Sequence, residues 1–330
     1  MSKVKDTEYL FLSTYIRARE NALLGEKRLE QMVEAADFDE AARVLTECGF
    51  PDLAGAPDAQ LEEAFQARRA AFLDEFEKLC PEKDIVTAYR LKYDYHNAKV
   101  LVKGEGSPQD RQRLLSACGR VRPAALTEAY TADEWRGVPA PLAEAVREAR
   151  TTLARTSNPQ LADMGLDRAY FAEMLAVTGG LSTPFYRDYV RLTIDMANLR
   201  SAVRCIRGHM DEGLLRTAVI DGGNVSPDRV CRSYAEGVTE VFHDRALARC
   251  AELGQQAVNG APLADFERAC DNVLTEYLTA AKQAPFGPAV AVAYLASLEA
   301  EITAARMVLL GKRGGLAPEA LRERLRESYV

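Results

Sequence analysis

The sequence predicts an all-α protein built from three similar helical subdomains. Long segments rich in Ala, Leu, Glu and Arg have apolar residues that recur every three or four positions, which indicates amphipathic helices. Strict polar and apolar alternation, the pattern of a half-buried strand, is nearly missing. A polar signature that recurs at intervals of about a hundred residues predicts the subdomains.

The composition is that of an ordinary globular protein, with 48% hydrophobic and 28% charged residues. There are 42 Lys and Arg against 49 Asp and Glu, so the net charge is −7. An acidic chain has no overall basic field that would attract phosphate backbones or anionic lipid. We therefore expect no nucleic-acid partner.

The seven cysteines indicate reduced thiols rather than a disulfide framework, because their number is odd and none forms a CxxC pair. Free cysteine usually packs as a small hydrophobic residue, as in a cytosolic protein. The cysteines are Cys48, Cys80, Cys118, Cys205, Cys231, Cys250 and Cys270.

The amino terminus reads as an amphipathic helix, because Asp6, Glu8, Arg17 and Arg19 interrupt its apolar residues too early for a signal peptide. The longest apolar stretch, residues 289–298, is about half of the 20 residues needed to cross a bilayer. We expect no transmembrane segment.

The first elements follow in order along the chain. A first helix is predicted to stop before Asp37, which suits the N-cap of a short helix over residues 40–48. Further helix starts are expected at Asp58, Ser107 and Ser226. The first helix shows its periodic pattern at Leu23, Leu24, Lys27, Arg28, Met32 and Val33.

The polar signature first appears in KYDYHNAKVLVKG, residues 92–104, as Asp94, Asn97 and Lys99. It returns in LTIDMANLRSAVR, residues 192–204. The matching residues of this second copy are Asp195, Asn198 and Arg200.

A third copy lies in LEAEITAARMVLLGK, residues 298–312, where Glu301 and Arg306 take the acidic and basic places and Ala304 replaces the Asn. The three signature helices are expected to stop at Gly104, Gly208 and Gly311. A leucine-rich helix is expected after each stop, over residues 110–119, 212–219 and 318–325. The predicted repeat units are residues 1–120, 121–222 and 223–330.

Helical geometry places Asp94 and Asn97 on one face with Leu101, while Lys99 points away from it. A buried acid and amide in line with an apolar seam can fix the register of neighbouring helices, which is the role we expect. The functional alternative is an all-α enzyme in which Asp94, Asp195 and Glu301 converge at the threefold axis, to bind a metal or move protons.

Motifs for catalysis and nucleotide binding are missing from the sequence. There is no GxxxxGK[ST] phosphate loop, since Gly311 and Lys312 are followed by Arg313, and neither HExxH nor GxSxG occurs. We expect no catalytic or cofactor-binding residues, no metal site and no direct binding of ATP.

The combination of YDYHNAKVLVKG, DMANLR, LDRAYFAEML (166–175) and the closing block FGPAVAVAYLASLEAEITAARMVLLGKRGGL (286–316) resembles the C subunit of bacterial and archaeal V-type or A-type rotary ATPases. Eukaryotic V-ATPases carry the same family as their d subunit. The resemblance runs from YIRAREN (15–21) to RESYV (326–330), and it departs from the family at Ala304, where an Asn is usual.

The resemblance implies a funnel-shaped protein of three helical lobes with pseudo-threefold symmetry. In this family the protein has no catalytic activity, and it lies at the cytoplasmic face of the membrane-embedded proteolipid ring as a peripheral protein. Its hollow receives the rotating shaft made of the D and F subunits, so that it couples the shaft to proton or sodium transport. Arg17 and Arg19 fit the family's basic first helix and are possible partner contacts. A stand-alone helical scaffold or adaptor is the alternative, which would explain the repeats but not the combined motifs.

Overall fold

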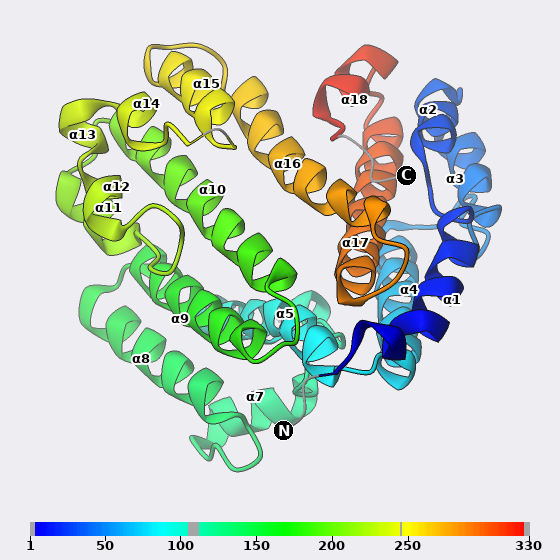
Figure 1. The fold of residues 1–330 in the computed structure, drawn as a ribbon, viewed down its shortest axis with the longest axis horizontal. Coiled ribbons are helices and arrows are strands. Elements are labelled where there is room, and N and C mark those ends of the chain that lie inside the picture. The colour runs from blue at the N-terminus through cyan, green and yellow to red at the C-terminus, as the bar shows by residue number, and fades with distance from the viewer. Residues whose placement is uncertain (1–3, 105–111, 245, 327–330) are drawn as a thin grey trace. The chain divides into compact units, whose positions relative to one another are not determined.

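The computed structural model describes residues 4–104, 112–244 and 246–326, which form helices joined by turns and include no strand (Figure 1). The all-α prediction is confirmed. Contacts divide the chain into two compact units: unit 1 combines residues 1–82 with 262–330, and unit 2 is residues 83–261. The division into three repeat units stays a prediction from the signature.

Unit 1 is built from both ends of the chain, and α17 is its central helix. This helix packs against α1, α2, α3, α16 and α18. The rings of Phe72 and Phe76 on α4 lie against Tyr294 of α17, with centroids 5.4 and 6.5 Å apart, and Arg69 of α4 pairs with Glu299 at 2.8 Å. The elements are η1 (Asp6–Tyr9), α1 (Leu10–Glu20), α2 (Glu26–Glu34), α3 (Phe38–Thr46), α4 (Asp58–Leu79), α16 (Leu263–Thr279), η3 (Ala280–Gln283), α17 (Pro288–Arg313) and α18 (Pro318–Arg324).

Unit 2 is organised around two long helices, α9 and α10, which pack on each other. Helix α9 also contacts α5 and α8, and α10 contacts α11 and α15. The described elements are α5 (Lys83–Lys103), α7 (Pro123–Ala132), α8 (Ala140–Thr156), α9 (Pro159–Gly179), α10 (Phe185–Arg207), α11 (Glu212–Ala218), α12 (Pro227–Cys231), α13 (Ser233–Glu236), α14 (Val238–Val241) and α15 (Ala248–Val258).

Several helix ends agree with the sequence. Asp37 caps α3 by accepting a hydrogen bond from the Glu40 N–H at 2.9 Å. Helix α4 begins at Asp58, and Ser226 is the N-cap residue of α12. Ser107 and residues 110–111 of the expected helix over 110–119 lie outside the described residues; residues 112–114 are helical, but the prediction is wrong for residues 115–119, which belong to a loop.

Two helix boundaries differ from the prediction. The first periodic segment is broken by a turn at residues 21–25, so Leu23 and Leu24 are buried in the turn and α2 begins at Glu26. Helix α17 continues through Gly311 and ends at Arg313. Periodicity cannot distinguish one bent helix from two helices whose apolar residues face one core.

Helix α17 is also longer than its apolar stretch suggested. An 18-residue window of this 26-residue helix is apolar enough to cross a membrane by length and composition alone. However, 67% of the qualifying window is buried inside the structure, as in the core helix of a globular unit. The seven cysteines are free and buried, as predicted.

Gly311 allows α18 to pack closely on α17. A Cβ atom added at Gly311 would lie 2.4 Å from Cδ2 of Leu321, a fully buried residue, and 3.3 Å from Cδ1 of Leu316. A glycine inside a helix normally weakens it, so here the close packing compensates for the weaker helix.

We predict that Gly311→Ala lowers the melting temperature, because overpacking costs about 1–3 kcal/mol and exceeds the gain in helix propensity of about 1 kcal/mol. Gly165→Ala in α9 is the matched control, since its Cβ would meet no atom within 4 Å; it should be neutral or stabilising. Thermal unfolding of both variants tests this, and an equal response of the two would contradict the packing argument.

Candidate functional site: buried acid and amide pairs

The first signature copy lies on α5, where Asp94 and Asn97 are fully buried. The Asn97 amide exchanges two hydrogen bonds with the backbone of Ser116: Nδ2 donates to its carbonyl at 2.9 Å, and Oδ1 accepts from its N–H at 2.8 Å. Asp94 accepts from the Val121 N–H at 3.1 Å and from Nε of Arg120 at 2.6 Å. The pair therefore holds the loop 116–121 against α5.

The second copy repeats this geometry on α10. Asn198 donates to the Ile220 carbonyl at 2.8 Å and accepts from the Ile220 N–H at 2.9 Å. Asp195 accepts from the Val225 N–H at 3.0 Å and from the backbone and side-chain nitrogens of Asn224 at 3.1 and 2.8 Å. Asn224 thus takes the place that Arg120 has in the first copy.

A glycine lets each loop approach its carboxylate. A Cβ atom at Gly119 would lie 2.4 Å from Oδ1 of Asp94, and a Cβ atom at Gly223 would lie 2.4 Å from Oδ1 of Asp195. Non-bonded carbon and oxygen atoms cannot lie this close together. Any residue with a Cβ atom would therefore push the loop away from the carboxylate.

Burial raises the pKa of Asp94 and Asp195 above the ordinary value of an aspartate. Arg120 and the Val121 N–H oppose this for Asp94, as the Val225 N–H and Asn224 do for Asp195. These donors reduce the penalty for burying a charged carboxylate. They also satisfy oxygens that would otherwise lack partners.

Arg120 extends the first copy to α9. Its Nη1 donates to Glu173 at 2.7 Å, and the second carboxylate oxygen of Glu173 accepts from the Tyr95 hydroxyl at 2.9 Å. The chain of contacts from Asp94 to Tyr95 ties α5, the loop and α9 together.

The third copy differs from the first two in both its acid and its amide position. Glu301 on α17 is 5% exposed, and neither of its carboxylate oxygens has a hydrogen-bond partner among the described residues. Burial, opposed most by Arg68, raises its pKa from 4.5 to about 7. Ala304 provides no amide.

The basic residues of the signature lie off the buried face. Lys99 pairs with Asp167 of α9 at 2.6 Å, and Arg306 pairs with Glu62 of α4 at the surface. Arg200 is half-buried on α10.

The two arginines of α1 have different surroundings. Arg17 pairs with Glu20 at 2.8 Å and donates to the Ala284 carbonyl at 2.9 Å, so it joins α1 to the segment before α17. Arg19 is exposed, pairs with Glu75 of α4 at 3.3 Å and lies over the Tyr15 ring.

The loop residues were missed by the sequence analysis, although a signal for them exists. Gly119, Val121 and Pro123 recur, with the same spacing, as Gly223, Val225 and Pro227. In both copies the valine N–H binds the aspartate and the proline begins the next helix. Both loops therefore contain the motif G-x-V-x-P.

The contacts of Asp94 and Asp195 give no support to the shared site of the enzyme alternative. Asp94 and Asp195 have separate partners, as described above. Within the described ranges, no three His, Cys, Asp or Glu side chains are grouped to hold a metal ion.

The fold is helical, and its buried acid and amide pairs bind loops. These features define a structural protein in which buried polar groups hold the backbone in place. A family model for the ATP synthase (C/AC39) subunit matches residues 12–324. The chain therefore belongs to this family, whose members are parts of V-type and A-type rotary ATPases and are not themselves the enzyme.

Curated relatives from three organisms are similar over nearly the whole chain. The C subunit of the V-type sodium ATPase of Enterococcus hirae is 26% identical over 98% of this chain and 99% of its own length. The C subunit of the V-type ATP synthase of Thermus thermophilus is 26% identical over 93% and 94%. The C subunit of the A-type ATP synthase of Haloferax volcanii is 24% identical over 94% and 95%.

We predict that Asp94→Ala and Asp195→Ala each lower the free energy of unfolding by at least about 1–3 kcal/mol, because each change leaves buried donors without an acceptor. Lys99→Ala is the control from the same signature; it removes a partly exposed ion pair and should cost no more than about 1 kcal/mol. Chemical denaturation measures both. Equal effects of the aspartate and lysine changes would show that the buried contacts of the aspartates do not stabilise the fold.

Proposed function

We propose that this chain is the central-stalk C subunit of a V/A-type ATPase, a socket that couples a rotating shaft made of the D and F subunits to the membrane proteolipid ring. The observation that carries the proposal is the match to the family and to C subunits of such ATPases over nearly the full length of both chains. The protein would lie at the cytoplasmic face of the membrane and transmit rotation for proton or sodium transport.

The structure of each unit supports a mechanical role. A part that transmits torque must resist deformation, and close-packed helices transmit strain. In unit 2, the loops after α5 and α10 are each held by four or more hydrogen bonds from the signature residues. These contacts keep two connecting segments in a fixed position on the helices that bear them.

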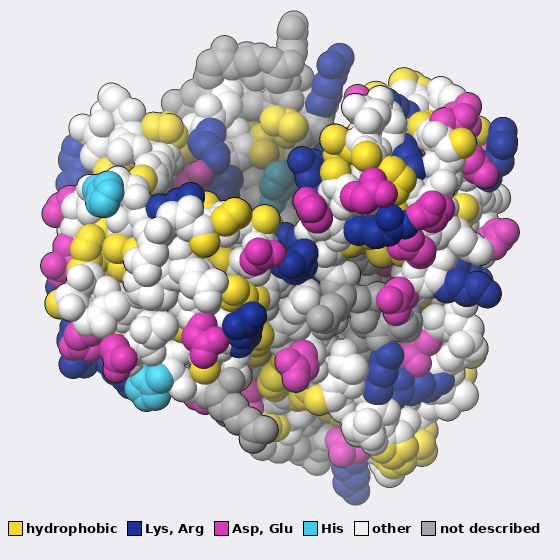
Figure 2. Space-filling model, turned by 90° about the horizontal axis from the view of Figure 1, so that it is seen from above, with side chains coloured by type: hydrophobic (Ala, Val, Ile, Leu, Met, Phe, Trp, Pro, Cys, Tyr) yellow, Lys and Arg dark blue, Asp and Glu magenta, His cyan; other side chains and the backbone are white. Residues whose placement is uncertain are grey.

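The surface suits partners that associate through polar contacts. Figure 2 shows acidic and basic side chains intermixed over the visible face, with hydrophobic side chains in small groups between them. Polar interfaces of this kind permit assembly and separation, whereas large apolar interfaces favour permanent association.

We expect a purified D–F complex to bind this chain in solution without nucleotide. Titration by calorimetry, or co-elution in size exclusion, should detect a complex at micromolar concentrations. An unrelated helical protein of similar charge serves as the control for non-specific association. Failure to form any complex, with both components folded, would count against the socket.

Arg19 is the better of the two proposed partner contacts, because its side chain is exposed, whereas Arg17 is half-buried and donates to the backbone carbonyl of Ala284. We predict that Arg19→Ala weakens binding to the D–F shaft or to the proteolipid ring by about two- to fivefold, as for a charge at an interface rim. Arg306→Ala is closely matched, since Arg306 is also exposed and ion-paired with a glutamate of α4. If the two variants bind each partner equally well, Arg19 is not part of the interface.

A further inference from the structure

The turn at residues 21–25 lies beside α17 in unit 1, where Ala22 and Leu23 line a pocket together with Leu298, about one helical turn from Glu301. The Leu24 N–H lowers the pKa of the Glu301 carboxyl, but among the described residues it forms no hydrogen bond with it, unlike the valine N–H groups that bind the aspartates of the other two copies. In each copy a helix begins two residues after this N–H: α2 here, and α7 and α12 in unit 2. The third signature helix thus faces a turn from the opposite end of the chain.

This third contact lacks the features that secure the other two. Ala22 stands two residues before Leu24, where the other loops have the glycine that admits the carboxylate. Among the residues that the structure describes, the Glu301 carboxylate has no hydrogen-bond partner, and Ala304 has no amide side chain to bind the turn's backbone. Arg28 provides other contacts with the turn in place of the missing acid and amide contacts. Its Nη1 donates to the carbonyls of Asn21 and Leu23 at 3.1 and 2.9 Å.

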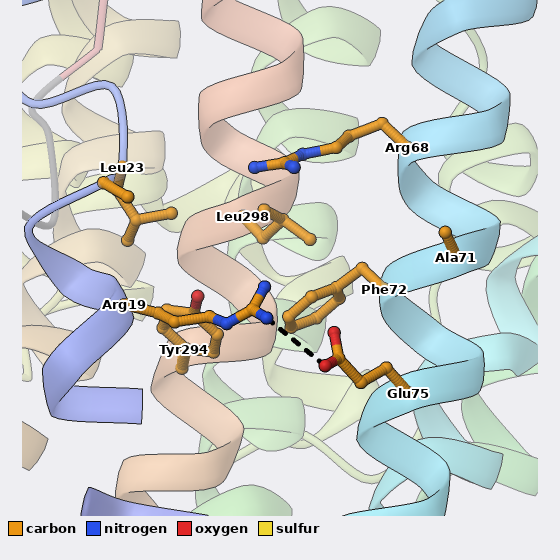
Figure 3. A pocket seen from close by; sticks show the side chains of 9 residues that line it. Arg19, Leu23, Arg68, Ala71, Phe72, Glu75, Tyr294 and Leu298 are labelled. Atoms are coloured by element: carbon orange, nitrogen blue, oxygen red, sulfur yellow. Dashed lines mark hydrogen bonds and ion pairs between the residues drawn. The ribbon is translucent and has the colours of Figure 1, made fainter. Parts of the chain in front are cut away.

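A pocket of about 120 Å³ adjoins the same turn (Figure 3). Ala22 and Leu23 form its edge, while Tyr294 and Leu298 of α17 and residues of α4 form the remaining walls. Figure 3 shows Arg68 reaching from α4 toward α17 and the pair of Arg19 with Glu75 crossing below it. The turn therefore has free space beside it, unlike a close-packed core.

We propose that the 21–25 turn is a pH-responsive latch: it closes on α17 while Glu301 is protonated, and it is released when Glu301 loses its proton. The neutral acid tolerates burial without partners far better than the carboxylate does. Deprotonation places an unsatisfied charge beneath the turn, and opening lets water reach that charge.

Glu301 is the group among its neighbours that changes charge near neutral pH. The facing charges are the guanidinium groups of Arg68 on α4 and Arg28 on α2. Cys48 after α3 and Tyr294 of α17 also face it, and burial raises the pKa of both, which keeps them neutral.

The sign of the pH effect follows from the raised pKa. The closed turn holds the proton up to about pH 7, whereas an open, hydrated Glu301 would release it near the ordinary value of 4.5. Protonation of Glu301 therefore stabilises the closed turn fully below about pH 4.5. This stabilisation decreases as the pH rises and is lost above about pH 7.

Hydrogen exchange on the full-length chain at pH 6 and pH 8 tests the latch. After correction for the intrinsic pH dependence of exchange, the opening constant of the turn should rise by up to about tenfold in the wild type, as these two pKa values require. In Glu301→Gln, which keeps the shape without the titrating proton, it should change less than about twofold.

Arg68→Gln gives a second readout, because removing the facing cation should shift the opening transition to higher pH. It remains informative if Glu301→Gln does not fold. A wild-type turn that opens equally at both pH values would overturn the latch. So would a Glu301→Gln turn with the wild-type pH response, or an Arg68→Gln transition at unchanged or lower pH.

Discussion

The architecture of unit 2 depends on one constraint: an acid and an amide buried on the same face of a helix must find partners away from water. Both α5 and α10 meet this constraint with the backbone of the loop that follows them in the chain. A buried polar group without partners is costly, so the loop has essentially one acceptable position. The helix that begins directly after each loop is oriented by the same contacts.

This arrangement explains how a chain without catalytic motifs can have a conspicuous polar core. The carboxylates accept hydrogen bonds from backbone N–H groups and neighbouring side chains. Their raised pKa is a consequence of burial rather than an indication of catalysis. Membership of the ATP synthase (C/AC39) subunit family agrees with such a structural use of charge. Stiff connections between helices are what the proposed coupling role needs.

The sequence predicted the helical class, the signature and the cap at Asp37, because these depend on local periodicity and spacing. It did not predict the break at residues 21–25 or the passage of α17 through Gly311, since tertiary packing decides both. For the candidate site, spacing identified the acids and amides, yet their partners lie in loops with no helical periodicity. Their own repeated glycine, valine and proline pattern was a second, shorter signal. The contact of Glu301 with a turn from the other end of the chain has no local signal at all.

Unit 1 joins residues 1–82 to residues 262–330, so unit 2 is an insertion within it. During synthesis on the ribosome, the continuous unit 2 has all of its own residues well before the last part of the nascent polypeptide completes unit 1. Helices α1, α2 and α3 therefore lack their contacts with α17 until that helix emerges. We expect the middle of the chain to fold first during biogenesis, with the early helices exposed to chaperones in the meantime.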